Sequence, residues 1–271
     1  EFFAASRTRP ARSILFLAFD NEEEGLRGSE YWTAHPTVPI GDVVAMLCLD
    51  MLGRSMMDRF PGRVFALGTE WSHDLGRILD AAPAPKGVEV WPLGTEFVGP
   101  RSDFLHFGLR RIPYVFFTTG THSAYHTPRD VPEDVDYHSL EGVTRVIASF
   151  VGKIAAAPAR PRFHWARGNP VRDAKVVHAI VDSMKMEPPG DLEPWQEGVL
   201  DFVHRHSARI MERGKVGCLG RVALVAGTQL LLLTAVESSR TSPDAVDGGA
   251  ESEADGDEDA PQRPRPGERG R

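Results

Sequence analysis

Cysteine is scarce in this chain of 271 residues, which contains only Cys48 and Cys218. Two cysteines so far apart exclude a disulfide framework and a cysteine-rich metal site. A surplus of basic charge is also missing, because 31 Lys and Arg residues stand against 38 Asp and Glu residues. Without a basic stripe that could bind a phosphate backbone, we predict no nucleic-acid partner.

The chain starts with Glu1 rather than methionine, and no signal peptide is visible. Its opening EFFAASRTRP has the pattern of the last turns of a helix followed by a basic loop. A chain that begins inside a helix is expected to be a fragment or a processed product. The compartment is therefore left open, and an exported or periplasmic parent protein is compatible with the sequence.

Long hydrophobic runs are absent as well. The most apolar stretch, residues 222–236, is shorter than the roughly 18 to 20 residues of a membrane-spanning helix and contains Thr228 and Gln229. We predict a buried helix there, and a weak membrane anchor is the alternative.

Short apolar runs alternate with amphipathic stretches over residues 1–157. The runs typical of strands are 13–19, 43–49, 64–67, 88–91 and 113–118. The helical patterns are 26–34, 71–82, 103–107 and 139–157. Because the run VVAMLCL is apolar at every position, we expect a sheet covered on both faces. The alternation predicts an α/β layer fold.

Three further segments follow this α/β domain. Residues 158–170 form a proline-rich linker, and residues 171–236 form a helical region of unknown role. Helical patterns occupy 171–184, 194–212 and 221–236. Residues 237–271 hold ten acidic and five basic residues without apolar periodicity, which predicts a disordered, solubilising acidic tail.

Acidic residues and histidines follow three of the predicted strands. They are Glu22, Glu23 and Glu24 after 13–19, Asp50 at the end of 43–49, and His122 and His126 after 113–118. In an open α/β sheet, ligands bind at the carboxyl ends of the strands. Carboxylate and imidazole ligands together suit zinc and leave a position open for water.

Each group also has a simpler structural explanation. The glutamates would form an ordinary first helical turn, and Asp50 would be a turn residue. Asp103 would cap a helix, and Thr127 before Pro128 would only make a rigid turn. Their joint occurrence at successive strand ends favours a common metal site.

Four stretches of the sequence resemble the zinc-dependent aminopeptidases of the bacterial leucyl aminopeptidase type. They are FDNEEEGLRGSEYW, LCLDMLGRS, RSDFLHFGLRRIPYVFFTTG and YHTPRD. The same family includes glutaminyl cyclases and transferrin-receptor-like carboxypeptidases. The resemblance covers roughly residues 1–157. It implies a zinc exopeptidase fold with a mixed, largely parallel central sheet sandwiched by helices.

The resemblance implies a role for each matching residue. Glu22 would be the general base that activates water, and Glu23 would be a zinc ligand, with Glu24 at a variable position. His126 would bind the same zinc ion as Glu23, and Asp50 would bind a second one. The residues expected near the substrate or behind these groups are Tyr125, Asp103, Asp130 and His122.

Members of this family carry two further ligand segments upstream of the paired glutamates: a His-x-Asp sequence and an aspartate that bridges the two metals. Neither segment occurs in the given sequence. We therefore expect a parent aminopeptidase that uses two zinc ions on peptide or protein N-termini, and an inactive chain as given. The alternatives are a glutaminyl-peptide cyclotransferase with one zinc ion and a non-catalytic, peptidase-like binding domain.

Overall fold

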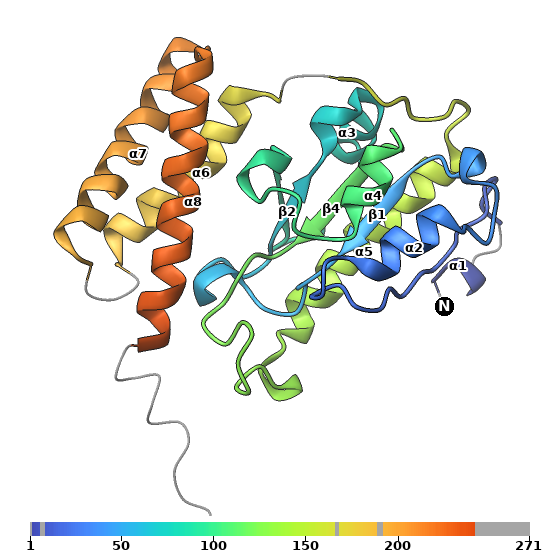
Figure 1. Ribbon diagram of the computed structural model, residues 1–271, viewed down its shortest axis with the longest axis horizontal. Helices are drawn as coiled ribbons and strands as arrows, with labels where there is room; N and C mark the ends of the chain where they lie inside the picture. The colour runs from blue at the N-terminus through green and yellow to red at the C-terminus, as the bar shows by residue number, and fades with distance from the viewer. Residues whose placement is uncertain (1, 6–8, 166–167, 189–191, 242–271) are drawn as a thin grey trace, which may run out of the picture.

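A four-stranded sheet lies at the centre of the α/β part, with helices on both faces and three further helices beside it (Figure 1). The computed structural model describes residues 2–5, 9–165, 168–188 and 192–241. The strands are β1 (Met46–Leu49), β2 (Arg63–Leu67), β3 (Glu89–Leu93) and β4 (Tyr114–Thr118), in the order β1-β4-β2-β3. They confirm the last four predicted strands.

The sheet is mixed and largely parallel, as expected. Strand β1 pairs in parallel with β4, and β2 pairs in parallel with β3. The central pair of β2 and β4 is antiparallel. Because β1 and β4 run in the same direction, with Leu49 opposite Phe117, their carboxyl ends meet at one edge of the sheet.

Side chains of the central strands alternate between two apolar layers, because successive residues of a strand point to opposite faces. Helices α3 (His73–Asp80) and α5 (Tyr137–Ala156) cover one face and share its buried cluster with Val64, Ala66, Val115 and Phe117. Helix α4 (Phe104–Leu109) packs on the other face with Phe65, Leu67, Tyr114 and Phe116. Both layers exclude water, which explains why the central residues of β2 and β4 are apolar on both faces of the sheet.

The helix ends follow from local capping residues. Ser72 accepts a hydrogen bond from the backbone N–H of Leu75 at the start of α3, and Asp136 accepts one from Ser139 at the start of α5. Helix α2 (Arg27–Ala34) packs on α4, where Trp32 stacks on Phe107 with ring centroids 5.5 Å apart. A short helix α1 (Phe2–Ala5) matches the predicted helix end at the start of the chain.

The predicted helical region consists of α6 (Pro170–Met186), α7 (Pro194–Arg213) and α8 (Cys218–Thr241). Asn169 caps α6 ahead of Pro170, and Glu193 with Gln196 forms a capping box on α7. These helices share a buried cluster with β2 and β3, so the helical region packs directly on the sheet layer (Figure 1).

Helix α8 corrects one boundary. The helix continues to Thr241, so residues 237–241 are helical and are not part of a disordered tail. The backbone of the helix continues in helical conformation beyond residue 236, where its apolar run and its predicted end lie. The rest of the predicted tail, residues 242–271, lies outside the described residues. No helix in the described part of the chain is both long enough and apolar enough to cross a membrane.

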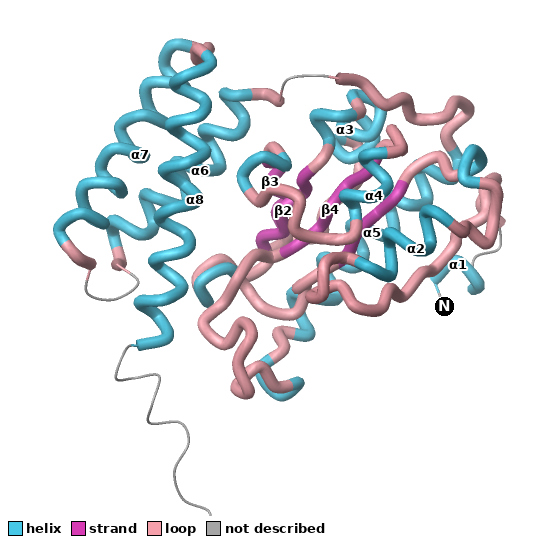
Figure 2. Tube along the Cα trace, in the orientation of Figure 1, coloured by secondary structure: helices cyan, strands magenta, loops and turns pink. Residues whose placement is uncertain are grey.

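The predicted strand at residues 13–19 is wrong, since this segment has no regular secondary structure (Figure 2). Leu17 and Phe19 pack against the cluster of Trp32, Phe107 and Ile112, whereas the side chain of Phe16 is 83% exposed. An apolar run becomes a strand only when a neighbouring strand accepts its hydrogen bonds. No described strand pairs with residues 13–19, which face β1 across a cavity.

Candidate metal centre

The chemically active residues converge at the carboxyl edge formed by β1 and β4. Asp50 follows β1, the loop with Tyr125 and His126 follows β4, and Asp103 precedes α4. The turn before α2 adds Glu22 and Glu23. These side chains and Asp130 line one cavity of about 1930 Å³. The structure thus brings together seven of the eight predicted site residues.

The turn that carries the glutamates depends on two glycines. Gly25 has a φ of +94°, a conformation that residues with a Cβ atom rarely adopt. A Cβ atom on Gly28 would lie 2.4 Å from the backbone oxygen of Asp20, so only glycine fits at this approach. The backbone N–H of Gly28 donates to that same oxygen at 3.0 Å. The two glycines thus allow the tight turn that leads into α2.

Glu23 and His126 meet directly, although 103 positions separate them in the sequence. Oε1 of Glu23 lies 2.8 Å from Nε2 of His126, and the two side chains are 70% and 50% exposed. Two donors bound to one zinc ion at roughly 2.0–2.2 Å would lie about 3.3 Å apart. A small opening of this contact would therefore admit a metal ion.

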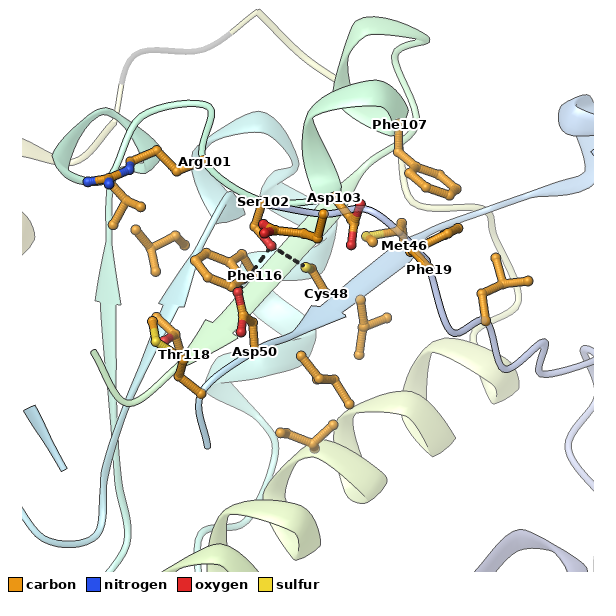
Figure 3. A pocket seen from close by; sticks show the side chains of 18 of the residues that line it. Phe19, Met46, Cys48, Asp50, Arg101, Ser102, Asp103, Phe107, Phe116 and Thr118 are labelled. Atoms are coloured by element: carbon orange, nitrogen blue, oxygen red, sulfur yellow. Dashed lines mark hydrogen bonds between the residues drawn. The ribbon is translucent and has the colours of Figure 1, made fainter. Parts of the chain in front are cut away.

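Asp50 lies deeper, at the end of a short polar chain (Figure 3). The Ser102 hydroxyl donates to Oδ2 of Asp50 at 3.3 Å and also lies 3.3 Å from the Cys48 sulfur. Burial raises the pKa of the Asp50 carboxyl, and the Ser102 hydrogen bond opposes this increase. Burial also raises the pKa of the Cys48 thiol to about 12, so the thiol stays protonated.

The carboxyl of Glu22 lies close to several other carboxylates of the site. Burial raises the pKa of its carboxyl, and the carboxylates of Asp50, Glu23 and Asp103 raise it further. Oδ1 of Asp103 is buried and has no hydrogen-bond partner among the described residues. A cation would relieve this repulsion and supply the missing partner, so the donor set fits a divalent metal such as zinc.

The backbone around these residues is strained. Four residues have φ values between +52° and +59°, a region that residues other than glycine rarely adopt: Asn21, Leu26, Met51 and His126. Asn21 precedes Glu22, Met51 follows Asp50, His126 is itself a predicted ligand, and Leu26 ends the turn that carries the glutamates. Such strain persists where the surrounding structure holds it, and it is concentrated at functional sites.

Two predicted residues behave differently from the ligands. His122 is 4% exposed and does not line the cavity; its Nε2 lies 3.8 Å from Oδ2 of Asp130. Tyr125 stacks on His126 with ring centroids 3.8 Å apart, and its pKa is raised by burial and by the Glu23 carboxylate. The geometry is thus compatible with a ligand role for His126 and a supporting role for His122.

Several residues at the cavity were not predicted. The hydroxyl of Ser102 donates to Asp50, but in the sequence Ser102 is distinguished only by its position before Asp103, the candidate helix cap. The helical region had no readable motif, yet Ile180 of α6 and Thr228, Gln229 and Leu232 of α8 line the same cavity. Gln229 donates to the backbone oxygen of Glu96 at 2.9 Å and thereby holds α8 at the cavity wall. Sequence spacing contains no signal for such a contact.

This fold and its carboxylate–imidazole pocket define an α/β protein whose candidate site lies at the carboxyl edge of the sheet. The profile of peptidase family M28 matches residues 1–151. The chain belongs to peptidase family M28, which confirms the resemblance to the zinc exopeptidases at the level of the family.

A solved structure, an aminopeptidase from Aneurinibacillus sp. strain AM-1, is similar with a TM-score of 0.40 and 24% identity. The similarity covers 55% of this chain and 34% of that one, so this chain spans about a third of the length of that aminopeptidase. No curated protein matches the sequence.

Proposed function

We propose that this chain supplies part of the active site of a zinc aminopeptidase. The observation that carries the proposal is the contact between Glu23 and His126, whose donor atoms lie 2.8 Å apart at the sheet edge. Asp50 and Glu22 line the same cavity. Membership of peptidase family M28 supports a peptidase reaction at this site.

Glu23 and His126 would hold one zinc ion, and Asp50 would hold a second. Bound zinc lowers the pKa of water to about 7 and polarises the carbonyl group of the scissile bond. Ser102 orients the Asp50 carboxylate through its hydrogen bond of 3.3 Å. Hydrogen bonds of this kind fix the direction of a ligand's lone pair and affect metal affinity.

Glu22 would accept the proton of the attacking water and deliver it to the leaving amine. Burial raises the pKa of its carboxyl, and a rise in this direction favours proton transfer in both steps. The phenol of Tyr125 would donate to the carbonyl oxygen of the substrate. The surrounding carboxylates would attract the positively charged amine of a peptide, which favours removal of the first residue.

Three donors are fewer than two catalytic zinc ions require, because a catalytic zinc site has about three protein ligands. We therefore expect this chain as given to bind zinc at the Glu23–His126 pair but to hydrolyse peptides slowly or not at all. Activity would appear in the full gene product that carries these residues.

Calorimetric zinc titration of the chain and of the Glu23→Ala/His126→Ala variant tests the metal assignment. We expect the double variant to lose one binding site, while His138→Ala, which alters an exposed histidine outside the cavity, keeps it. An unchanged number of sites in the double variant would refute the ligand assignment.

Hydrolysis of leucine p-nitroanilide by the zinc-loaded full gene product tests the reaction. The Glu22→Gln variant is expected to lose at least about 100-fold in kcat because a general base is removed. Cyclisation of an N-terminal glutamine without anilide hydrolysis would instead show a cyclotransferase. Neither reaction, with zinc bound, would show a binding domain.

A further inference from the structure

A second cluster of metal-ligating side chains lies between α6 and α7, outside the M28 site. His178 and Asp182 are four residues apart and therefore share one face of α6. His204 of α7 faces them, and one ligand atom from each of the three residues lies within 4.8 Å of the others. None of these residues lines the cavity of the first site.

Ser207 determines which nitrogen of His178 is available. Its hydroxyl donates to the backbone oxygen of His204 at 2.9 Å, which uses its single proton. The same oxygen lies 3.0 Å from Nδ1 of His178, so Nδ1–H is the donor in this second bond. In a neutral imidazole the other nitrogen, Nε2, then carries the lone pair that a metal requires. Ser207 is fully buried, which keeps this arrangement in place.

The remaining contacts also suit a metal ion. Nε2 of His204 lies 3.4 Å from Oδ1 of Asp182, and the two imidazole rings stack with centroids 4.5 Å apart. No lysine or arginine in the described part of the chain pairs with Asp182, since Lys185 and Arg205 both pair with Asp201. The side chain of Asp182 is 52% exposed, so water can reach the cluster.

We propose that one nitrogen each of His178 and His204 and a carboxylate oxygen of Asp182 bind a zinc ion that joins α6 to α7. Two imidazoles and one carboxylate are a donor set that zinc prefers, and water fills the open position. Magnesium and calcium prefer oxygen donors alone, so they compete poorly. The ion would brace the helices that pack against the cavity wall of the M28 site.

The test uses the full chain with Glu23→Ala, His126→Ala and Asp50→Asn, which removes all three proposed ligands of the first site and leaves the second site intact. Calorimetric zinc titration of this background is expected to show one equivalent. The visible absorption of bound cobalt should report nitrogen and oxygen donors. Adding His204→Ala or Asp182→Ala should abolish the saturable binding, while adding His138→Ala should leave it unchanged.

The Ser207→Ala variant separates a positioning role from a ligand role. It removes only the hydroxyl next to His178, and we expect the zinc affinity to fall by about 10–100-fold at unchanged stoichiometry. Far-ultraviolet circular dichroism of every variant should retain the helical signal, which separates loss of ligands from loss of the fold.

Zinc should also raise the unfolding temperature of the background protein, because an ion that binds only the folded state stabilises it. No binding at millimolar zinc would overturn the proposal and would leave His204 and Asp182 as a simple surface ion pair. Binding that His204→Ala and Asp182→Ala do not weaken would overturn it too. Neither result depends on the peptidase proposal, whose site is absent from this background.

Discussion

Replacing Arg221 with methionine should destabilise the contact between the helical region and the α/β part. Nη2 of Arg221 on α8 lies 2.9 Å from Oδ2 of Asp173 on α6, and Arg221 also pairs with Glu96 of the α/β part. Oδ1 of Asp173 accepts the backbone N–H of Gly94 at 3.1 Å. The side chain of Asp173 is 1% exposed, so Arg221→Met leaves a buried charge without its partner.

The magnitude follows from that burial and depends on pH. Removing one partner of a buried ion pair destabilises a protein by about 3–5 kcal/mol. Burial already raises the pKa of Asp173 from 3.8 to about 6, although Arg221 opposes this. The folded state therefore holds this proton more tightly than the unfolded state. The contribution of Asp173 to stability is largest below pH 3.8 and falls as the pH rises towards 6.

Without Arg221 the pKa of Asp173 rises further, so at pH 5 the carboxyl of the variant is protonated and needs no cation. We expect Arg221→Met to lower the free energy of unfolding by about 3–5 kcal/mol at pH 8 and by roughly 1 kcal/mol at pH 5. Urea unfolding followed by circular dichroism at both pH values measures the difference.

Two variants control this experiment. Asp173→Asn/Arg221→Met removes both charges and should be more stable than Arg221→Met at pH 8, with little dependence on pH. Arg145→Met breaks the exposed pair with Glu141 on α5 and should change stability by about 1 kcal/mol or less. An equal loss for Arg221→Met at pH 5 and pH 8 would refute the reasoning, because an uncompensated carboxylate cannot give that result.

Three further variants test the core and the candidate site. Phe150→Ala empties a position that is 0% exposed and should lower the free energy of unfolding by about 3–5 kcal/mol in urea, whereas Phe16→Ala, at an 83% exposed position, should change it by about 0.5 kcal/mol or less. Gly28→Ala forces a Cβ atom against the backbone of Asp20 and should lower the free energy of unfolding by about 1–3 kcal/mol in the same assay. Gly41→Ala is its control, because no atom lies within 4 Å of a Cβ at that position. Equal stability of the two variants would contradict the close approach at Gly28. Ser102→Ala removes the hydroxyl that orients Asp50 and should weaken calorimetric zinc binding at Asp50 by about 10–100-fold in the full gene product, without changing the stoichiometry at Glu23 and His126.

Much of the α/β part was predictable because its signals are local. Apolar runs of four to seven residues indicated β1 to β4 within a few residues of their ends. The capping residues Ser72 and Asp136 lie directly before α3 and α5, close to the predicted starts at residues 71 and 139. The residues proposed as base and ligands were chosen from motif spacing, and the fold places them around one cavity.

The segment at residues 13–19 shows where local signals fail. Its composition is that of a strand, but strand formation requires hydrogen bonds to a second segment. Hydrophobic pattern measures burial and says nothing about whether a partner strand lies alongside. Leu17 and Phe19 are indeed packed against apolar neighbours, while the backbone stays outside the sheet.

The sequence by itself determined the α/β class, four of the five predicted strands, and the family motif that contains Glu22 and Glu23, because these signals lie in neighbouring residues. The family resemblance implied that Glu23 and His126 share a metal ion, but only the tertiary structure decided how closely distant side chains approach one another. The 2.8 Å contact of Glu23 with His126, the wall that α8 forms through Gln229, and the cluster of His178 with His204 all join separate elements. Such contacts result from how helices and strands pack, and packing distances are not encoded in the spacing of residues along the chain.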